Sequence, residues 1–279
     1  MRPLITLQIG GGIGSLIGQT HRIAMQMDRR FDLVGGIFNS SHEKSLQMAE
    51  QLGLQPNRTY SDFDTLIEGE NRLGEDKADC ISICTPNETH FSYCKAALNA
   101  GFHVVCDKPI AGTVQEAEEL EKIAADKGLI LAVTYNYSGY PMVREARERI
   151  LAGEIGRPYI VNVEMPQAAV SKLKASGEIE PRMRWRLDLA KSGGSLVLLD
   201  LMTHVVQMAE YVSGQKIEKL SADCQAINNA HGVDDNAVLS CKFDKGAIGQ
   251  LWASFVATGT EQGLSFQIFG EQGSLHWKQ

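Results

Sequence analysis

The chain lacks a basic surplus and any long apolar run. Its 279 residues carry 34 Asp and Glu against 27 Lys and Arg, a formal net charge of −7. A nucleic-acid-binding protein needs a basic face, so this balance argues against a nucleic-acid partner. No apolar run approaches the roughly twenty residues that cross a bilayer, and Gly10–Gly12 interrupts the apolar run that a signal peptide would need. We therefore expect no membrane partner and a cytoplasmic location.

Cysteine pairs, repeats and low-complexity segments are also missing. None of the six cysteines forms a C-x-x-C pair, and Cys80, Cys84 and Cys106 fall on apolar, strand-like runs. This pattern favours buried free thiols in a reducing cytoplasm over zinc ligands or disulfides. The length suits about two domains.

What is present in the first half is an alternation of strand-like and helical segments. Capping-box spacings at Ser40–Glu43 and Thr113–Glu116 open two of the helices. Strand, helix and strand with short turns imply right-handed crossovers and a parallel sheet. We predict an α/β fold with a doubly wound Rossmann domain over residues 1–134. Its strands are expected at 4–9, 31–38, 78–84, 102–106 and 129–134, and its helices at 13–27, 40–53, 88–100 and 113–128.

The second half, residues 135–279, changes character. A helix over 141–151 and a strand over 159–164 precede a long polar stretch over 165–191 and a mostly apolar helix over 195–212. Five strand-like runs follow, and Asp244-Lys245-Gly246 is typical of a hairpin turn. We predict an α+β domain with a mostly antiparallel open sheet and helices on one face. The five runs are 217–227, 237–243, 248–255, 264–269 and 274–277.

A glycine-rich turn lies between the first expected strand and helix. Its glycines and Ser15 fit the spacing G-x-G-x-x-small. Such a turn lets the backbone approach a pyrophosphate, and the N–H groups at the helix start favour that anion. A glycine-rich turn without a ligand is the alternative. We expect a dinucleotide to contact Gly10, Gly12, Ile13, Gly14 and Ser15.

The end of the second strand bears on the choice of cofactor. Residues 38–41 carry no acid that would bind the ribose 2′-hydroxyl and repel a 2′-phosphate. Asn39 and Ser40 stand there instead, and Lys44 adds positive charge, although the serines also suit a helix cap with Glu43. We expect NAD or NADP as the cofactor, with NADP accepted.

Two polar clusters directly follow strands, at the carboxyl edge where ligands of such sheets bind. They are Thr85-Pro86-Asn87-Glu88-Thr89-His90 and Cys106-Asp107-Lys108-Pro109. A lysine beside a cofactor cleft can hydrogen-bond a substrate hydroxyl and stabilise an alkoxide, whereas the alternative is an exposed loop lysine. The expected cofactor contacts here are Thr85, Pro86, Asn87, His90, Asp107 and Lys108.

Asp200 and His204 form the third cluster. Their i, i+4 spacing puts both on one face of an otherwise apolar helix. A partly buried histidine beside a carboxylate can accept a proton near neutral pH. A core His–Asp pair is the alternative, and we reject a metal site because no third ligand has suitable spacing.

Taken together, these motifs resemble the Gfo/Idh/MocA oxidoreductases over essentially the whole chain. The matching features are the glycine-rich turn, T-P-N-x-x-H, K-P at a strand end and S-G-G-(x)5-D-x-x-x-H. The family comprises NAD(P)-dependent dehydrogenases of sugars, inositols and related polyols, and residues 135–144 resemble its glucose-fructose oxidoreductase-like and levoglucosan dehydrogenase-like members. The resemblance implies that Lys108, Asp200 and His204 surround the carbon that exchanges a hydride.

The implied roles follow the chemistry of a carbinol. His204 takes the hydroxyl proton, Lys108 hydrogen-bonds the same oxygen, and Asp200 orients the sugar. Trp185 and Arg186 are candidate substrate contacts, and a core role for Trp185 is the alternative. Tyr137 is a third candidate, for which packing at the sheet edge is favoured.

The chain also departs from the family pattern. Asp107 replaces a common glutamate, Ser195 interrupts the glycines, and Met202 stands where glycine is frequent and would crowd a sugar. The chain stops at Gln279, just after a strand, so we expect a C-terminally shortened second domain. Exposed sheet faces need cover, and we expect a homodimer or homotetramer. A non-catalytic NAD(P)-binding regulator and a bare structural Rossmann module are the rival interpretations.

Overall fold

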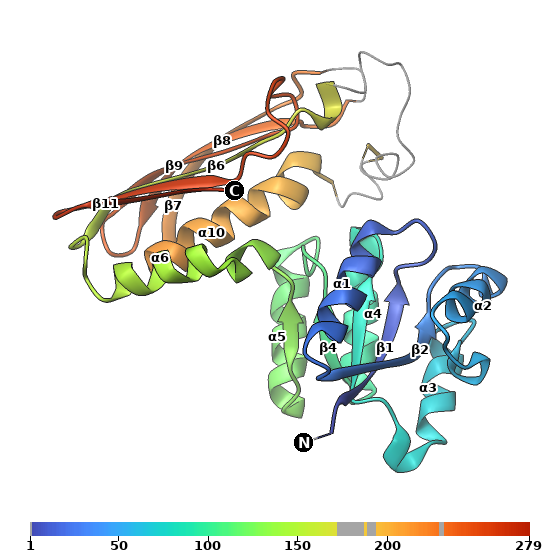
Figure 1. Cartoon of the computed structure of the whole chain (residues 1–279). Coiled ribbons are helices and arrows are strands. Elements are labelled where there is room, and N and C mark those ends of the chain that lie inside the picture. Colours follow the sequence, from blue (N-terminus) through green and yellow to red (C-terminus); the bar gives the residue numbers. More distant parts are fainter. Residues whose placement is uncertain (1, 172–186, 189–193, 229–231) are drawn as a thin grey trace. The chain divides into compact units, whose positions relative to one another are not determined.

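A computed structural model describes residues 2–171, 187–188, 194–228 and 232–279 (Figure 1). The chain divides into two compact units, Met1–Thr134 and Tyr135–Gln279. Trp185 and Arg186, two of the expected substrate contacts, lie outside the described residues.

The N-terminal unit is built on a five-stranded parallel sheet with the order β2-β1-β3-β4-β5. The strands are β1 (Leu4–Gly10), β2 (Phe31–Ile37), β3 (Cys80–Cys84), β4 (His103–Cys106) and β5 (Leu131–Val133). The helices are α1 (Leu16–Met27), α2 (His42–Gln51), α3 (Phe63–Asn71), α4 (His90–Asn99) and α5 (Val114–Lys127), with short 3-10 turns η1 (Pro56–Arg58), η2 (Gly74–Asp76) and η3 (Asn87–Thr89). This sheet confirms the predicted doubly wound domain, although α3 was not predicted from the sequence.

The strand order of this sheet reverses beside β1. The chain moves from β1 to β2 on one side and then crosses to β3 on the other. The loops that leave β1 and β3 therefore start side by side at a topological switch point, where open α/β sheets bind their ligands. The β1–β3 pairing ends at Gly10 opposite Cys84, so the glycine-rich turn and the T-P-N loop begin at paired positions.

Two helix starts differ from the prediction by a few residues. α1 begins at Leu16 rather than at residue 13, because Gly14 has φ +83° and Ser15 caps the helix by accepting from the Gly18 N–H at 3.2 Å. α2 is capped by Ser41 rather than Ser40. The predicted capping box of Thr113 and Glu116 is confirmed.

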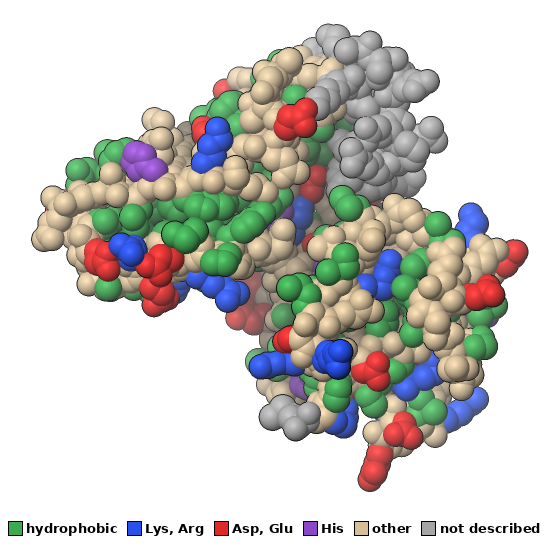
Figure 2. All heavy atoms as spheres, viewed as in Figure 1, with side chains coloured by type: hydrophobic (Ala, Val, Ile, Leu, Met, Phe, Trp, Pro, Cys, Tyr) green, Lys and Arg blue, Asp and Glu red, His purple; other side chains and the backbone are tan. Residues whose placement is uncertain are grey.

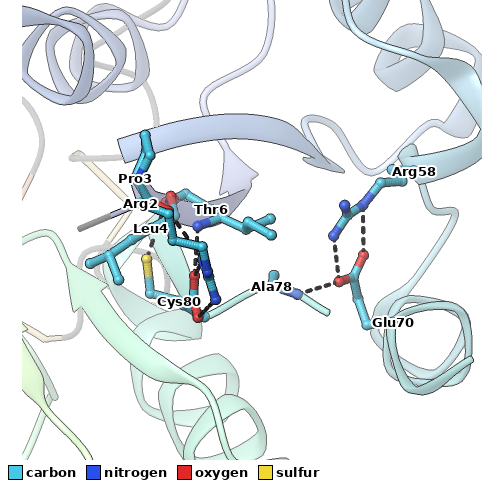
Figure 3. A network of polar contacts seen from close by, with 10 residues as sticks. Arg2, Pro3, Leu4, Thr6, Arg58, Glu70, Ala78 and Cys80 are labelled. Atoms are coloured by element: carbon cyan, nitrogen blue, oxygen red, sulfur yellow. Dashed lines mark hydrogen bonds and ion pairs between the residues drawn. The ribbon is translucent and has the colours of Figure 1, made fainter. Parts of the chain in front are cut away.

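A buried carboxylate connects α3 to the start of β3 (Figure 3). Glu70 is 0% exposed and accepts hydrogen bonds from Arg58, from the Tyr60 hydroxyl at 2.7 Å and from the Ala78 N–H at 2.8 Å. A buried charge is tolerated when its lone pairs are satisfied in this way. Burial, and then the bond to Glu70, raise the pKa of Tyr60.

The C-terminal unit is a six-stranded sheet of order β11-β10-β6-β9-β8-β7. All neighbours pair antiparallel except β6 and β9, which are parallel. The strands are β6 (Pro158–Pro166), β7 (Ile217–Gln225), β8 (Asn236–Phe243), β9 (Ile248–Ser254), β10 (Ser265–Gly270) and β11 (Ser274–Lys278). The helices are α6 (Pro141–Leu151) and α10 (Thr203–Ser213), with the 3-10 turn η4 (Asn136–Gly139) and the π-helical turn η5 (Leu198–Met202).

The helices α6 and α10 pack side by side on one face of this sheet (Figure 1). Alternate residues of β8 are buried under them, and the residues between are exposed or half-buried. This alternation is the signature of a half-buried antiparallel strand, and it confirms the predicted open, mostly antiparallel sheet. Within the described ranges, every helix is too short or too polar to cross a bilayer. On the face drawn in Figure 2, acidic and basic side chains are interspersed.

Candidate active site

The glycines of the β1–α1 turn are required by close backbone packing. A Cβ on Gly10 would lie 2.6 Å from the Cys84 carbonyl oxygen, and one on Gly12 would lie 2.6 Å from the Phe38 carbonyl oxygen. A side chain at Gly12 would therefore collide with the end of β2, which is a different reason for this glycine than the approach of a pyrophosphate. Gly14 differs from these two, because the space around its Cβ position is open. Glycine is favoured there by the backbone conformation, with φ +83°, and the exposed side of the turn stays free of side-chain atoms at this position.

The same turn presents unpaired backbone donors. Among the described residues, the N–H groups of Gly12, Ile13 and Gly14 have no hydrogen-bond acceptor, and Ile13 and Gly14 are exposed. They directly precede Ser15, the N-cap of α1, so the positive end of the helix dipole adds to them. Adjacent free N–H groups at a helix start form a site for an anion. The turn thus fits a dinucleotide pyrophosphate.

Asn39 lies beside this turn, at the end of β2. The position of a Cβ built on Gly12 would be 3.5 Å from Asn39 Nδ2. Asn39 Oδ1 accepts from the Ser41 N–H at 3.0 Å, which fixes its side chain, while Ser40 is exposed. The structure thus brings Asn39 next to the glycine turn and leaves Ser40 at the surface.

His90 joins the two polar clusters that follow β3 and β4. Its ring is 0% exposed, with Nε2 2.8 Å from the Thr85 carbonyl oxygen and Nδ1 2.6 Å from that of Pro109. Asp107 fixes the loop that follows β4 through two further hydrogen bonds. Its Oδ1 accepts from the Lys108 N–H at 2.9 Å and from the Thr134 hydroxyl at 3.1 Å. These bonds fix the backbone that carries the half-buried Lys108 side chain. His90 and Asp107 are therefore placed to position Lys108.

A buried polar cluster that was not predicted from the sequence lies beneath the glycine turn. Gln8 of β1 is 0% exposed, and its Oε1 accepts from Arg22 Nη1 at 2.6 Å. The neighbouring His21 is 7% exposed, with Nδ1 3.0 Å from the Ser82 hydroxyl. Burial lowers the pKa of His21, opposed by the charge of Asp107. The signal that could have revealed this cluster is a glutamine inside the apolar run of β1.

Asp200 and His204 lie on either side of the junction between the π-helical turn η5 and the α-helix α10. Asp200 is half-buried within the π-helical turn η5, and His204 is 5% exposed in the first turn of α10. We expected a regular α-helix here; the wider turn changes the direction in which Asp200 projects. Such π-bulges are frequent at functional sites.

Two tyrosines hold the His204 ring by edge contacts. The centroid of Tyr137 lies 4.7 Å from that of His204, and the centroid of Tyr135 lies 5.9 Å away, with both rings nearly perpendicular to the imidazole. Burial raises the pKa of Tyr137, and the nearby charge of Asp200 raises it further. The structure therefore gathers Tyr137, Asp200 and His204 into one cluster.

The start of this helix is capped from a distant loop. Asp234 Oδ1 accepts from the Leu196 N–H at 2.9 Å, and its Oδ2 accepts from the Ser195 hydroxyl. A carboxylate at a helix N-terminus satisfies free N–H groups and complements the dipole. Asp234 therefore fixes the segment that leads into Asp200.

A hollow of about 390 Å³ lies beside the turn η5 and the helix α10. The Tyr135 hydroxyl is 2.9 Å from the Thr203 hydroxyl at its rim. Met202 is 3% exposed and packs in the core. Within the described ranges, no group of three His, Cys, Asp or Glu side chains could hold a metal ion. The hollow is lined by Tyr135, Leu198, Met202, Thr203, Val206, Gln207 and Glu210.

Comparison with known proteins assigns both units. Residues 9–135 match the profile described as "Oxidoreductase family, NAD-binding Rossmann fold", and residues 143–276 match the "GFO/IDH/MocA C-terminal domain". The chain is 34% identical over 279 residues to the uncharacterized oxidoreductase YfiI of Bacillus subtilis, covering 99% of this chain and 70% of YfiI. It is 27% identical over 261 residues to levoglucosan dehydrogenase of Pseudarthrobacter phenanthrenivorans, covering 86% of this chain and 63% of that enzyme.

Solved structures give the same result. An inositol dehydrogenase homolog from Azotobacter vinelandii, complexed with NAD+, superposes with a TM-score of 0.93 at 34% identity, over 99% of this chain and 71% of that one. Its complex with NADH and myo-inositol superposes with a TM-score of 0.90. The resemblance drawn from the motifs is thereby confirmed: the chain belongs to the GFO/IDH/MocA family of oxidoreductases, with an NAD-binding Rossmann fold in its N-terminal unit.

Proposed function

We propose that the protein transfers a hydride between a nicotinamide cofactor and a hydroxyl or keto carbon of a sugar, inositol or related polyol. The observation that carries this proposal is the cluster of Tyr137, Asp200 and His204, in which one tyrosine contacts the ring of a buried histidine and feels the charge of a half-buried carboxylate. The homolog solved with NADH and myo-inositol supports the substrate class.

The N-terminal unit has the donors to hold the cofactor. The free N–H groups of Gly12, Ile13 and Gly14 suit the pyrophosphate, and Asn39 lies beside them for the adenosine ribose. The segment that leaves the neighbouring strand β3 at the switch point, up to the first residue of α4, carries the other proposed contacts, Thr85, Pro86, Asn87 and His90. When bound, the nicotinamide ring supplies an acceptor or donor of hydride.

Residues of the chain itself transfer the proton and orient the substrate. His204 takes the proton of the reacting hydroxyl during oxidation and returns it during reduction. Lys108 hydrogen-bonds the same oxygen and stabilises negative charge that develops on it. Asp200 orients the substrate through a neighbouring hydroxyl, and its negative charge stabilises the protonated His204 that forms during oxidation.

A substrate screen tests this function. NADH and NADPH fluorescence is followed with a panel that includes myo-inositol, levoglucosan and common aldoses. His204→Ala and Lys108→Ala should each lower kcat on the best substrate by about two or more orders of magnitude, with little change in cofactor affinity. An exposed lysine on α5 of the same unit, Lys122→Ala, whose side chain is 74% exposed, is the control. Retained turnover in either variant would remove that residue from the mechanism, and no turnover on any member would favour a non-catalytic role.

Cofactor choice follows from the end of β2. Since residues 38–41 provide no carboxylate, we expect NADP to be accepted beside NAD, with a preference below about a hundredfold in kcat/KM. The measurement compares kcat/KM for the two cofactors on one substrate. A preference for NAD above that limit would mean that another group rejects the 2′-phosphate.

We further propose a homodimer or homotetramer built on the open face of the C-terminal sheet. On that face, Val238 and Ile248 are 47% and 55% exposed on neighbouring strands, and the half-buried Trp252 lies opposite Val238. Exposed apolar side chains on a sheet face favour cover by a partner. A monomer by light scattering at high concentration would refute this.

All six cysteines are free thiols, which supports a reducing compartment such as the cytoplasm.

A further inference from the structure

The guanidinium of Arg22 is a buried cation without a carboxylate partner. The residue is 7% exposed on α1, beneath the glycine turn. Its Nη1 donates to Gln8 Oε1 at 2.6 Å and to the Gly11 carbonyl oxygen at 2.7 Å, and both acceptors are neutral. Among the described residues, no carboxylate forms an ion pair with Arg22, and its Nε and Nη2 have no acceptor. An uncompensated charge in this position costs free energy.

The bond from Arg22 to Gly11 also sets the direction of a backbone donor. The carbonyl of Gly11 and the N–H of Gly12 belong to one peptide group, and this peptide is trans. In a planar trans peptide these two bonds point in opposite directions. Because Arg22 holds the carbonyl inward, the Gly12 N–H points away from Arg22, alongside the free donors of Ile13 and Gly14.

Gln8 keeps the guanidinium in this place. Its side chain is fixed at both ends, because Oε1 accepts from Arg22 while Nε2 donates to the Gly18 carbonyl oxygen at 3.3 Å. Burial lowers the pKa of Arg22, with the Cys84 thiol acting in the other direction. The strand, the helix and the turn thus converge on one positive charge that they leave uncompensated.

We propose that Arg22 is a positioning residue for the cofactor and the counterion of its pyrophosphate. It aims the Gly12 N–H at the anion, and the anion compensates the charge that the fold leaves buried. This inference rests on the proposed binding of a nicotinamide dinucleotide at the turn. It predicts that the charge of Arg22 contributes to cofactor affinity and not to the stability of the ligand-free chain.

Two variants and one control separate charge from structure. Arg22→Gln removes the charge and keeps a donor, and Arg22→Lys keeps the charge. Arg30→Gln removes the same formal charge from a side chain that is 80% exposed. Calorimetric titration with NAD+ should show binding about tenfold or more weaker in Arg22→Gln, a smaller loss in Arg22→Lys and no change in Arg30→Gln.

Two further readouts exclude a merely structural effect. Adenosine has no phosphate, and its affinity, measured by competition against NADH, should be the same in Arg22→Gln as in the wild type. The ligand-free Arg22→Gln protein should melt at or above the wild-type temperature, because the variant removes an uncompensated buried charge. The NAD+ affinity of Arg22→Gln should also depend less on salt than that of the wild type.

The outcomes distinguish this inference from the function on which it rests. Wild-type NAD+ affinity in Arg22→Gln overturns the counterion role. Equal losses of NAD+ and adenosine affinity, or a lower melting temperature of the ligand-free variant, show that Arg22 only maintains the fold and also overturn it. A wild-type chain that binds neither NAD+ nor NADP+ refutes the proposed cofactor and, with it, this role.

Discussion

Replacing Gly18 with alanine should disrupt the cofactor turn through a single methyl group. Gly18 lies in the first turns of α1, against the glycine-rich segment. A Cβ there would be 2.2 Å from Gly11 Cα and 3.0 Å from the Gly11 carbonyl carbon and oxygen. Ordinary contact begins at 3.4 Å, so the backbone must separate by about 1.2 Å. All three neighbours are backbone atoms, and no side-chain rotation relieves the overlap.

Two opposing effects decide the change in stability. Alanine is favoured over glycine inside a helix by about 1 kcal/mol, and Gly18 has a φ that alanine can adopt. Overpacking of a tight contact costs about 1 to 3 kcal/mol, and an overlap with backbone atoms that no side-chain rotation relieves belongs in the upper part of that range, about 2 to 3 kcal/mol. We therefore expect a net loss of about 1 to 2 kcal/mol in the free energy of unfolding. This corresponds to a Tm lower by about 2 to 8 °C for a domain of this size.

The effect on binding should exceed the effect on stability. A shift of about 1 Å moves the N–H groups of Gly12, Ile13 and Gly14 off the geometry that an anion requires, because hydrogen bonds weaken steeply with misalignment. We expect NAD+ binding at least about tenfold weaker, or 1.4 kcal/mol, by calorimetric titration. Gly112→Ala is the matched control, because its Cβ would meet an ordinary contact at 3.6 Å. Wild-type affinity and melting temperature in Gly18→Ala would refute the close-packing argument.

Two further changes test other parts of the molecule. Asp234→Ala removes the cap of the helix that leads to Asp200, and should lower the free energy of unfolding by about 1 to 2 kcal/mol. It should also lower kcat without changing the Kd for NAD+, and an equal loss of cofactor affinity would contradict a local effect. Burial lowers the pKa of His21 below its ordinary value of 6.5. Below about pH 6.5 the unfolded chain therefore binds a proton that the native chain does not, and the free energy of unfolding should decrease as the pH is lowered. His21→Gln should flatten this part of the unfolding profile, and identical pH profiles for variant and wild type would show that His21 does not titrate in this way.

The elements that the sequence determined by itself are those whose signals are local. Continuous apolar runs located the strands of the N-terminal unit, and strand-like runs separated by turn residues located those of the C-terminal sheet. The Thr113–Glu116 spacing located a capping box, and Gly214 ended α10 with φ +65°. These features depend on residues at most four positions apart, and backbone preferences are set over that distance. The order of the chemical motifs was likewise sufficient to identify the family.

Tertiary structure alone decided how distant residues complete the two candidate sites. Gly12 is constrained by the carbonyl of Phe38, Arg22 is held by Gln8, and the helix that carries Asp200 is capped by Asp234. Within that helix, the π-helical turn of residues 198–202 replaced the regular winding that the i, i+4 pattern predicted. Contacts of this kind join residues from different elements, and the backbone preference of either residue carries no information about its partner. Their geometry is fixed only when the sheet and its helices pack together.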